Sequence, residues 1–352
     1  MPGVLTSRRT IWVFDARTDL VVALGWLPIW VVMHVLIGSG GASGDSYLSA
    51  GVQLALLVSF LHQPLTFGLV YGDVQQFLLH RRLFVLAPLI AVTVAAVAAG
   101  FNWWIVVPIA ALWNTQHTLQ QRYGVQRIYA RKSGYGSAQL DRALAYLPMG
   151  LVLLAVAAAP STESLLTRSG LGTVNSQGVR LLLDLRPVAT ALLVVVCFAT
   201  LSLFAALVRQ ERAAGTSANP AKWLYQLSSL GLLASIVVDP GAGFVAYVTA
   251  HAIEYFVIVL RTAQTRYGRE PDRTSFLGRI GHSALGRLGY FGAIVAVAWA
   301  VHAYLDGRAF NAVLYAVGAL HFTFDAVIWK LRRPAVASSF TIPAPAPAFT
   351  SP

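Results

Sequence analysis

Long apolar runs separated by short polar segments dominate the chain. A transmembrane helix needs about 20 predominantly apolar residues, because each residue adds about 1.5 Å along the axis. Ten runs approach this length. They cover residues 19–38, 48–71, 83–101, 102–121, 142–159, 188–208, 223–239, 243–260, 288–305 and 310–329. The pattern predicts an all-α, polytopic integral membrane bundle of about ten transmembrane helices.

Short turn sequences join several of these runs, as in Gly100–Asn102, Asp239-Pro240-Gly241 and Asp306-Gly307-Arg308. Glycine, proline, asparagine and aspartate favour tight turns, so the flanking runs are expected to form antiparallel hairpins. The predicted organisation is a cytoplasmic N-terminal segment over residues 1–18, a helical bundle over 19–333, and a proline-rich tail over 334–352. The tail is predicted to be disordered and cytoplasmic.

Basic residues test the span count, because cytoplasmic loops of membrane proteins are rich in Lys and Arg. With ten spans and both termini cytoplasmic, 22 of the 26 Lys and Arg residues fall on the cytoplasmic side. The outer side keeps Arg168, Arg180, Arg186 and Arg308. This asymmetry favours ten spans with both termini in the cytoplasm. An even count one pair lower is the alternative, because the third and fourth runs are close together.

Composition narrows the class of protein further. Hydrophobic residues make up 57% of the chain and charged residues 11%, against about 25% charged in soluble domains, which excludes a soluble enzyme. The single cysteine, Cys197, excludes a disulfide framework. The net charge of +12 is spread over six cytoplasmic segments, which predicts contact with membrane lipids and no nucleic-acid binding. The composition favours a multi-pass protein of the bacterial inner (cytoplasmic) membrane.

Ionisable residues inside predicted spans are costly and are therefore candidate functional residues. Four histidines on four different spans lie five to ten residues from the predicted cytoplasmic ends: His62, His117, His251 and His321. Glu254 and Asp325 fall in the same layer. His251 and Glu254 are three residues apart, and His321 and Asp325 four apart, so each pair projects from one helix face.

Two interpretations of each pair compete. A histidine and a carboxylate can pin neighbouring helices by hydrogen bonds, which explains one such pair well. Four histidines and two carboxylates at one depth are more ionisable residues than hydrogen bonding between neighbouring helices requires. We therefore predict that all six are metal ligands: His62, His117, His251, Glu254, His321 and Asp325. Glu254 and Asp325 could instead orient ligating histidines.

Imidazole and carboxylate ligands favour non-haem iron, as one or two ions, with manganese or zinc as less favoured alternatives. Four further polar side chains lie near the histidines in the sequence and are predicted to surround the cofactor: Asn114, Gln121, Tyr247 and Tyr255. For the amide-rich stretch around Asn114, the competing interpretation is a long helix that emerges into the cytoplasm.

The segment His321-Phe322-Thr323-Phe324-Asp325 resembles the HFxxD element of the Brp/Blh family. These are bacterial membrane-embedded, iron-dependent, carotene-cleaving dioxygenases with dispersed histidines. The resemblance covers this five-residue motif and the general architecture. It implies that His321 is a metal ligand and that the substrate is a long polyene or another isoprenoid.

These observations predict a membrane-embedded non-haem metal oxidoreductase or oxygenase that acts on a lipophilic substrate, such as an isoprenoid or an acyl lipid. An electron-donor protein is a candidate partner, and the oligomeric state is left open. Two alternatives use the same residues. One is a proton-coupled transporter with a relay of histidines and carboxylates. The other is a haem-binding membrane electron carrier.

Overall fold

The computed structural model describes residues 10–101, 105–170, 176–268, 274–305 and 307–342. Every regular element in these ranges is a helix, and none of them contains a strand. The prediction of an all-α chain is therefore confirmed.

The elements of the N-terminal half are α1 (Ala16–Leu24), α2 (Trp26–Gly38), α3 (Gly41–His62), α4 (Leu65–Tyr71), α5 (Val74–Leu79), α6 (Arg81–Gly100), α7 (Val106–Ser133), α8 (Ala138–Ala158) and α9 (Thr162–Arg168). Those of the C-terminal half are α11 (Ser176–Asp184), α12 (Arg186–Ala214), the 3₁₀ turn η1 (Gly215–Ser217), α13 (Pro220–Val238), α14 (Pro240–Tyr267), α15 (Phe276–Ile280), α16 (Ala284–Tyr304), α17 (Gly307–Ile328) and α18 (Pro334–Ser339).

Nine helical stretches within the described residues are long and apolar enough to cross a membrane. They match nine of the ten predicted runs. The predicted span 102–121 is not among them: residues 102–104 lie outside the described residues, and the rest belongs to α7, which is polar from Asn114 onward. The count of ten and the cytoplasmic termini stay predictions.

The nine stretches begin two to seven residues before the predicted runs. Polar residues at the helix starts explain the difference, because a hydropathy run omits them. Ser137 caps α8, Asn219 caps α13 and Asp239 caps α14, each by accepting a backbone N–H of the first turn. Asp239 ends α13 and starts α14, which confirms the predicted hairpin.

The third stretch, Gly41–Tyr71, is interrupted inside the bundle. Helix α3 ends at His62 and α4 starts at Leu65, with Pro64 between them. Proline has no N–H to donate, so the hydrogen-bond ladder of the helix stops there. Interrupted helices within a membrane bundle commonly lie at ligand sites.

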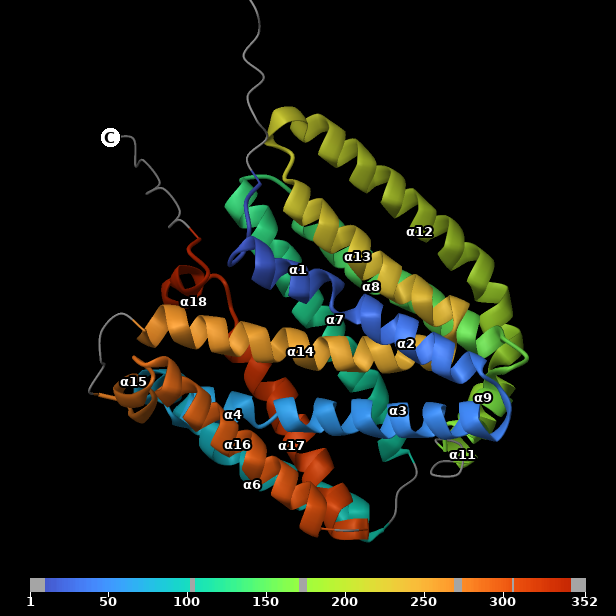
Figure 1. Cartoon of the computed structure of the whole chain (residues 1–352), viewed down its shortest axis with the longest axis horizontal. Coiled ribbons are helices and arrows are strands. Elements are labelled where there is room, and N and C mark those ends of the chain that lie inside the picture. The colour runs from blue at the N-terminus through green and yellow to red at the C-terminus, as the bar shows by residue number, and fades with distance from the viewer. Residues whose placement is uncertain (1–9, 102–104, 171–175, 269–273, 306, 343–352) are drawn as a thin grey trace, which may run out of the picture.

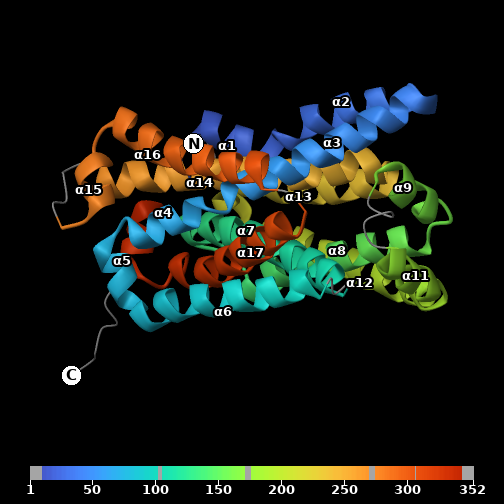
Figure 2. The same ribbon diagram turned by 90° about the horizontal axis from the view of Figure 1, so that it is seen from below.

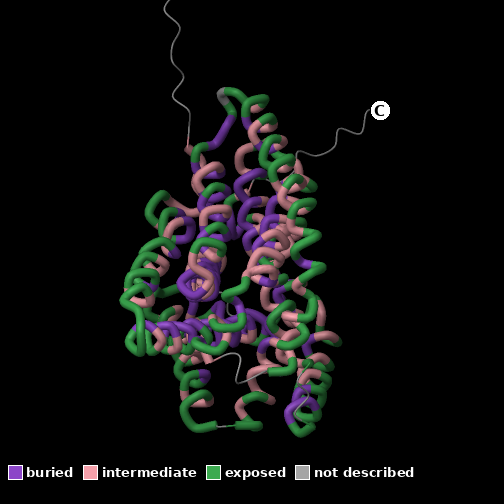
Figure 3. Tube along the Cα trace, turned by 90° about the vertical axis from the view of Figure 1, so that its right-hand side faces the viewer, coloured by how far each residue is buried: buried purple, intermediate pink, exposed green. Residues whose placement is uncertain are grey.

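Helix α14 runs through the centre of the bundle and packs against α3, α2 and α13; in Figure 1, α3 lies below it and α2 and α13 lie above it. Figure 2 shows α3 and α14 in one layer, with α7 and α17 in the layer beneath. Buried residues concentrate in the middle of the bundle and exposed residues on its outer helices (Figure 3). The outer helix α12 is apolar yet only 6% of its span is buried, as expected for a helix that faces lipid.

The tail requires a correction. Residues 334–342 were predicted to be disordered, but Pro334 starts α18, and Val336 and Phe340 are buried against residues of α1, α7 and α14. The apolar side chains of Val336 and Phe340 pack against the bundle. The prediction of disorder rested on the proline content of the tail and did not take these side chains into account. Residues 343–352, which hold four of the prolines, lie outside the described residues.

Candidate metal centre

Four histidines from four helices meet in the interior of the bundle. His62, His117, His251 and His321 each offer one ring nitrogen, and these four atoms lie within 4.8 Å of one another. All four side chains are buried, with at most 5% of any residue exposed. The structure therefore brings together the four histidines that the sequence placed at one depth.

Each layer of the bundle supplies two of the four rings. His62 is the last residue of α3 and His251 lies in the middle of α14, while His117 and His321 come from α7 and α17 beneath them. The interruption after His62 places that ring at a helix end. The cluster thus fills the gap between the two layers.

The distances between the rings suit a shared cation. His62 Nε2 and His321 Nε2 are 3.2 Å apart. Ligand atoms at the corners of a tetrahedron with metal–nitrogen bonds of 2.0–2.1 Å are about 3.3 Å apart. The ring centroids of His117 and His321 are 4.6 Å apart, and those of His62 and His251 are 4.8 Å apart.

Several ring nitrogens of the cluster have no hydrogen-bond partner within the described part of the chain. They are Nδ1 of His62, Nε2 of His117 and both nitrogens of His251. A buried polar atom without a partner costs about 1–3 kcal/mol. A lone pair directed at a metal ion would satisfy Nε2 of His117 and one nitrogen of His251, so these residues fit a cation.

His321 is held from its other side by a hydroxyl and a carboxylate. Its Nδ1 lies 2.7 Å from Thr66 Oγ1, which donates to Asp325 Oδ1 at 2.9 Å. The Tyr255 hydroxyl donates to the same carboxylate oxygen at 2.8 Å. Such a chain fixes the ring orientation and leaves Nε2 free to ligate. Asp325 is thus linked to His321 through Thr66, which is the arrangement that an orienting carboxylate, one of its two predicted roles, would require.

Asp325 is also near the rest of the cluster, with its Oδ2 3.9 Å from His117 Nε2. Sequence reasoning missed Thr66, because a single hydroxyl in an apolar run gives no spacing signal. It placed Tyr255 around the cofactor, and Tyr255 reaches the cluster through Asp325 and Thr66.

Glu254 requires a correction, since the structure gives it a different cation. Tyr225 donates to its Oε1, and its Oε2 lies 3.6 Å from the Arg122 guanidinium. Arg122 in turn donates to Ser229 at 3.0 Å. Glu254 is not in the set of ligand atoms within 4.8 Å. The i,i+3 spacing placed Glu254 and His251 on one face correctly but could not reveal Arg122, which was assigned to a cytoplasmic loop.

The other three polar residues predicted around the cofactor are placed as follows. Gln121 Nε2 donates to the backbone carbonyl of His251 at 3.4 Å, which links α7 to α14 beside the cluster. Asn114 Oδ1 and the Tyr247 hydroxyl are buried and have no hydrogen-bond partner in the described residues. None of the three is in the metal-binding set.

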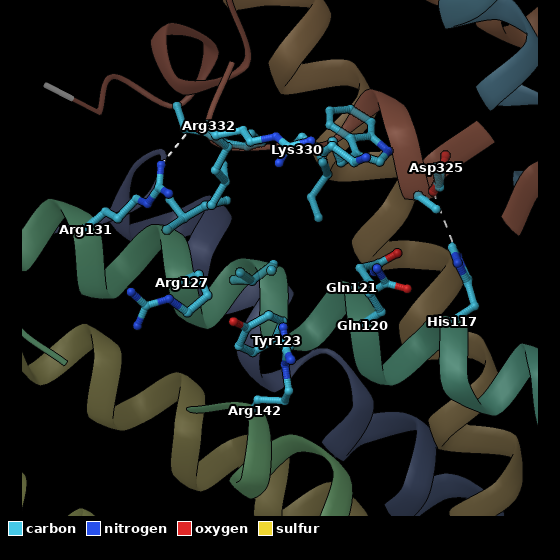
Figure 4. Close-up of a pocket in the computed structure, with 18 of the residues that line it drawn as sticks. His117, Gln120, Gln121, Tyr123, Arg127, Arg131, Arg142, Asp325, Lys330 and Arg332 are labelled. Atoms are coloured by element: carbon cyan, nitrogen blue, oxygen red, sulfur yellow. Dashed lines mark hydrogen bonds and ion pairs between the residues drawn. The ribbon is translucent and has the colours of Figure 1, made fainter. Parts of the chain in front are cut away.

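A cavity of about 520 Å³ begins at the cluster. His117, Asp325 and Tyr255 line its inner part. The remaining lining residues come mainly from the C-terminal half of α7 and the end of α17, with Arg142 of α8, Ile258 of α14 and Phe340. Figure 4 shows the cavity between α7 and α17. Ligand-binding pockets commonly have volumes of about 300–1,000 Å³. A small molecule could therefore reach the edge of the cluster.

The other four histidines lie elsewhere: His34, His80, His282 and His302. His34 Nδ1 pairs with Asp239 at 2.7 Å. His80 contacts the Arg333 guanidinium. Burial lowers the pKa of His80, and the positive charges of Arg333 and Lys330 lower it further. These contacts fit the structural roles expected for histidines at helix ends.

Comparison with known protein families, curated proteins and solved structures finds no match to this chain. The chemistry of the site is therefore argued from its own residues. The chain has apolar helices that suit a multi-pass membrane protein and a buried four-histidine cluster that could hold a metal ion.

Proposed function

We propose that the protein is a membrane-embedded, metal-dependent oxidoreductase that acts on a lipophilic substrate, with non-haem iron as its metal. One observation carries the proposal: four buried ring nitrogens from four helices lie within 4.8 Å, and a cavity begins beside them. A purely structural metal site is usually closed, whereas a catalytic site keeps a position accessible to substrate.

His62, His117, His251 and His321 would hold the ion. Bound there, iron would supply one-electron and dioxygen chemistry that side chains lack. Thr66 and Asp325 set the His321 ring, and apolar helices keep bulk water away from the cluster. Imidazole also suits zinc, copper and nickel, so the choice of iron is the part of this proposal that needs metal analysis.

A lipophilic substrate is proposed because the site lies inside a bundle whose outer helices face lipid. An isoprenoid or an acyl chain would suit this setting, and the resemblance of the His321–Asp325 segment to the Brp/Blh element supports an isoprenoid. We place the protein in the bacterial inner membrane, where an electron-donor protein would be a partner.

The packing of the cluster disfavours haem. Two axial histidines need a macrocycle between them, yet the His117 and His251 rings occupy the space beside the His62–His321 pair. The His117 and His251 centroids are themselves only 5.3 Å apart. A proton-coupled transporter uses the same residues without a metal, so metal content separates the two.

The test is elemental analysis and an absorption spectrum of the full chain purified in a neutral detergent. We expect about one transition-metal ion per chain, with iron predominant. His251→Ala should lose the metal, whereas His302→Ala, at an exposed histidine that is not in the cluster, should retain it. Equal metal content in the two variants, or metal-free protein after reconstitution with ferrous iron, would overturn the proposal.

A further inference from the structure

The cavity that begins at the histidine cluster is lined by cations at its far end. Five basic side chains line it: Arg127, Arg131, Arg142, Lys330 and Arg332 (Figure 4). Arg127 pairs with Asp141 at 2.5 Å. Within the described part of the chain, none of the other four forms an ion pair with a carboxylate, so about four positive charges remain there for a ligand to neutralise.

Two of these four cations contact uncharged groups, which do not neutralise their positive charge. Arg131 donates to the backbone carbonyl of Leu331 at 2.8 Å. The Arg142 guanidinium lies over the Tyr123 ring, 5.4 Å from its centroid. Guanidinium groups held in this way are well suited to binding phosphate oxygens, which accept paired hydrogen bonds.

The wall between the cations and the cluster is mainly apolar. Ile128, Ile258, Trp329 and Phe340 line it. The lining residues of α7 include positions 117, 120, 121, 124, 128 and 131, which follow one face of the helix. From His117 to Arg131 this face extends about 21 Å, at about 1.5 Å per residue. The cavity thus joins a basic end to the cluster through a mainly apolar channel, with Gln120 and Gln121 beside His117 at the inner end.

From this arrangement we infer that the cavity binds a single-chain lipid with a phosphate headgroup, with the phosphate at the basic end and the chain directed toward the histidines. The inference rests on the proposed function and narrows its substrate class. Several unpaired cations favour a phosphate over a carboxylate, because a phosphate monoester carries more negative charge. A neutral hydrocarbon would leave these cations without a partner.

The chain offers two independent perturbations with matched controls. Lys330→Gln with Arg332→Gln removes two cavity cations, and Arg81→Gln with Arg82→Gln removes two exposed cations at the start of α6 that do not line the cavity. An added Cβ at Gly124 meets no heavy atom of another segment within 4 Å, so Gly124→Leu narrows the channel without a clash.

Gly150→Leu is the matched control for Gly124→Leu. Gly150 also lies inside a helix, is partly buried and has open space around an added Cβ, but it does not line the cavity. Both changes replace a helical glycine, so any general effect on helix stability is shared.

The experiment measures binding of radiolabelled dodecyl phosphate to the full chain in phosphatidylcholine nanodiscs, with metal content determined on the same samples. We expect saturable binding of one lipid per chain. The Lys330/Arg332 variant should bind about 100-fold more weakly, because it loses two charge-assisted hydrogen bonds and each contributes about tenfold. Gly124→Leu should also weaken binding, while Gly150→Leu and the Arg81/Arg82 variant should match the wild type.

Two further ligands, dodecanol and inorganic phosphate, test whether the cavity recognises the chain, the phosphate or both. Dodecanol should bind more weakly than dodecyl phosphate and should be insensitive to the charge variants, and inorganic phosphate should compete poorly. Equal loss in the Arg81/Arg82 control, or inorganic phosphate binding as tightly as the lipid, would overturn the inference. Metal-loaded protein that fails to bind dodecyl phosphate refutes this inference alone, whereas lipid-binding protein without metal refutes the proposed function.

Discussion

Replacing Glu254 with glutamine tests whether this carboxylate forms a structural ion pair with Arg122 or ligates a metal ion. The amide keeps an oxygen that can accept from Tyr225 but removes the charge that faces Arg122. At a separation of 3.6 Å and an effective dielectric constant of about 20, the attraction between the two charges is about 5 kcal/mol. Leaving one buried charge unpaired costs a similar amount, about 3–5 kcal/mol.

We therefore expect Glu254→Gln to lower the free energy of unfolding by about 3–5 kcal/mol. Because Arg122→Met removes the other charge, the double variant should lose less than the sum of the single variants, with a coupling energy of about 2 kcal/mol. The assay is SDS-induced unfolding in detergent micelles, followed by tryptophan fluorescence. Metal content is measured in parallel on the folded fraction.

The outcome that refutes this reasoning is specific. If Glu254→Gln unfolds at the same SDS concentration as the wild type but has lost its metal, the carboxylate is a ligand and the Arg122 contact is incidental. If the double variant shows simple additivity, the two charges do not interact in the folded protein. Unchanged metal content with a large coupling energy supports the assignment.

Three further predictions concern other parts of the structure. Thr66→Val removes the hydroxyl between the histidine cluster and the site carboxylate, so metal affinity in a competition titration should fall about 10–100-fold, while Thr66→Ser should retain it. In the wild type, Lys222 Nζ lies 2.6 Å from Glu211 Oε1. Lys222→Met leaves the buried Glu211 carboxylate without this cation and should lower the free energy of unfolding by about 3–5 kcal/mol in the same SDS assay. The pKa of His80 is lowered in the folded protein, so the unfolded chain takes up that proton first and stability should fall as the pH drops below about 6.5. In thermal unfolding between pH 7.5 and 5.5, His80→Gln should show a smaller decrease; an identical decrease would exclude His80 and its Arg333 contact as a source of the pH dependence.

The sequence contained enough information to predict the helices and the histidine cluster. Nine of the ten apolar runs are helices in the structure, because a long apolar segment satisfies its own backbone hydrogen bonds best as a helix. The four histidines could be grouped before the structure was known, since distance from a helix end gives depth in a bundle. Depth and helix face grouped the four histidines, but they also placed Glu254 beside His251, whereas the structure pairs Glu254 with Arg122.

The depth of a residue along its helix could not predict which residues its side chain contacts. Arg122 looked like the first residue of a cytoplasmic loop, yet α7 continues to Ser133 and Arg122 is 4% exposed. Its burial follows from the arrangement of α7, α13 and α14, which no local pattern encodes. The same holds for Thr66, and for the contact between the α18 region and residues 12–14.

The interruption between α3 and α4 has a mechanical consequence. His62 belongs to one rigid helix and Thr66 to another, and both contact the ring of His321. The link between the two helices is two residues long. Leu65, Leu69 and Val70 pack α4 into the same buried cluster as Leu320 and Phe324 of α17, so α4 is fixed against the helix that carries His321. The two halves of the broken helix therefore hold one imidazole ring from two directions, and the packing of both sets its orientation.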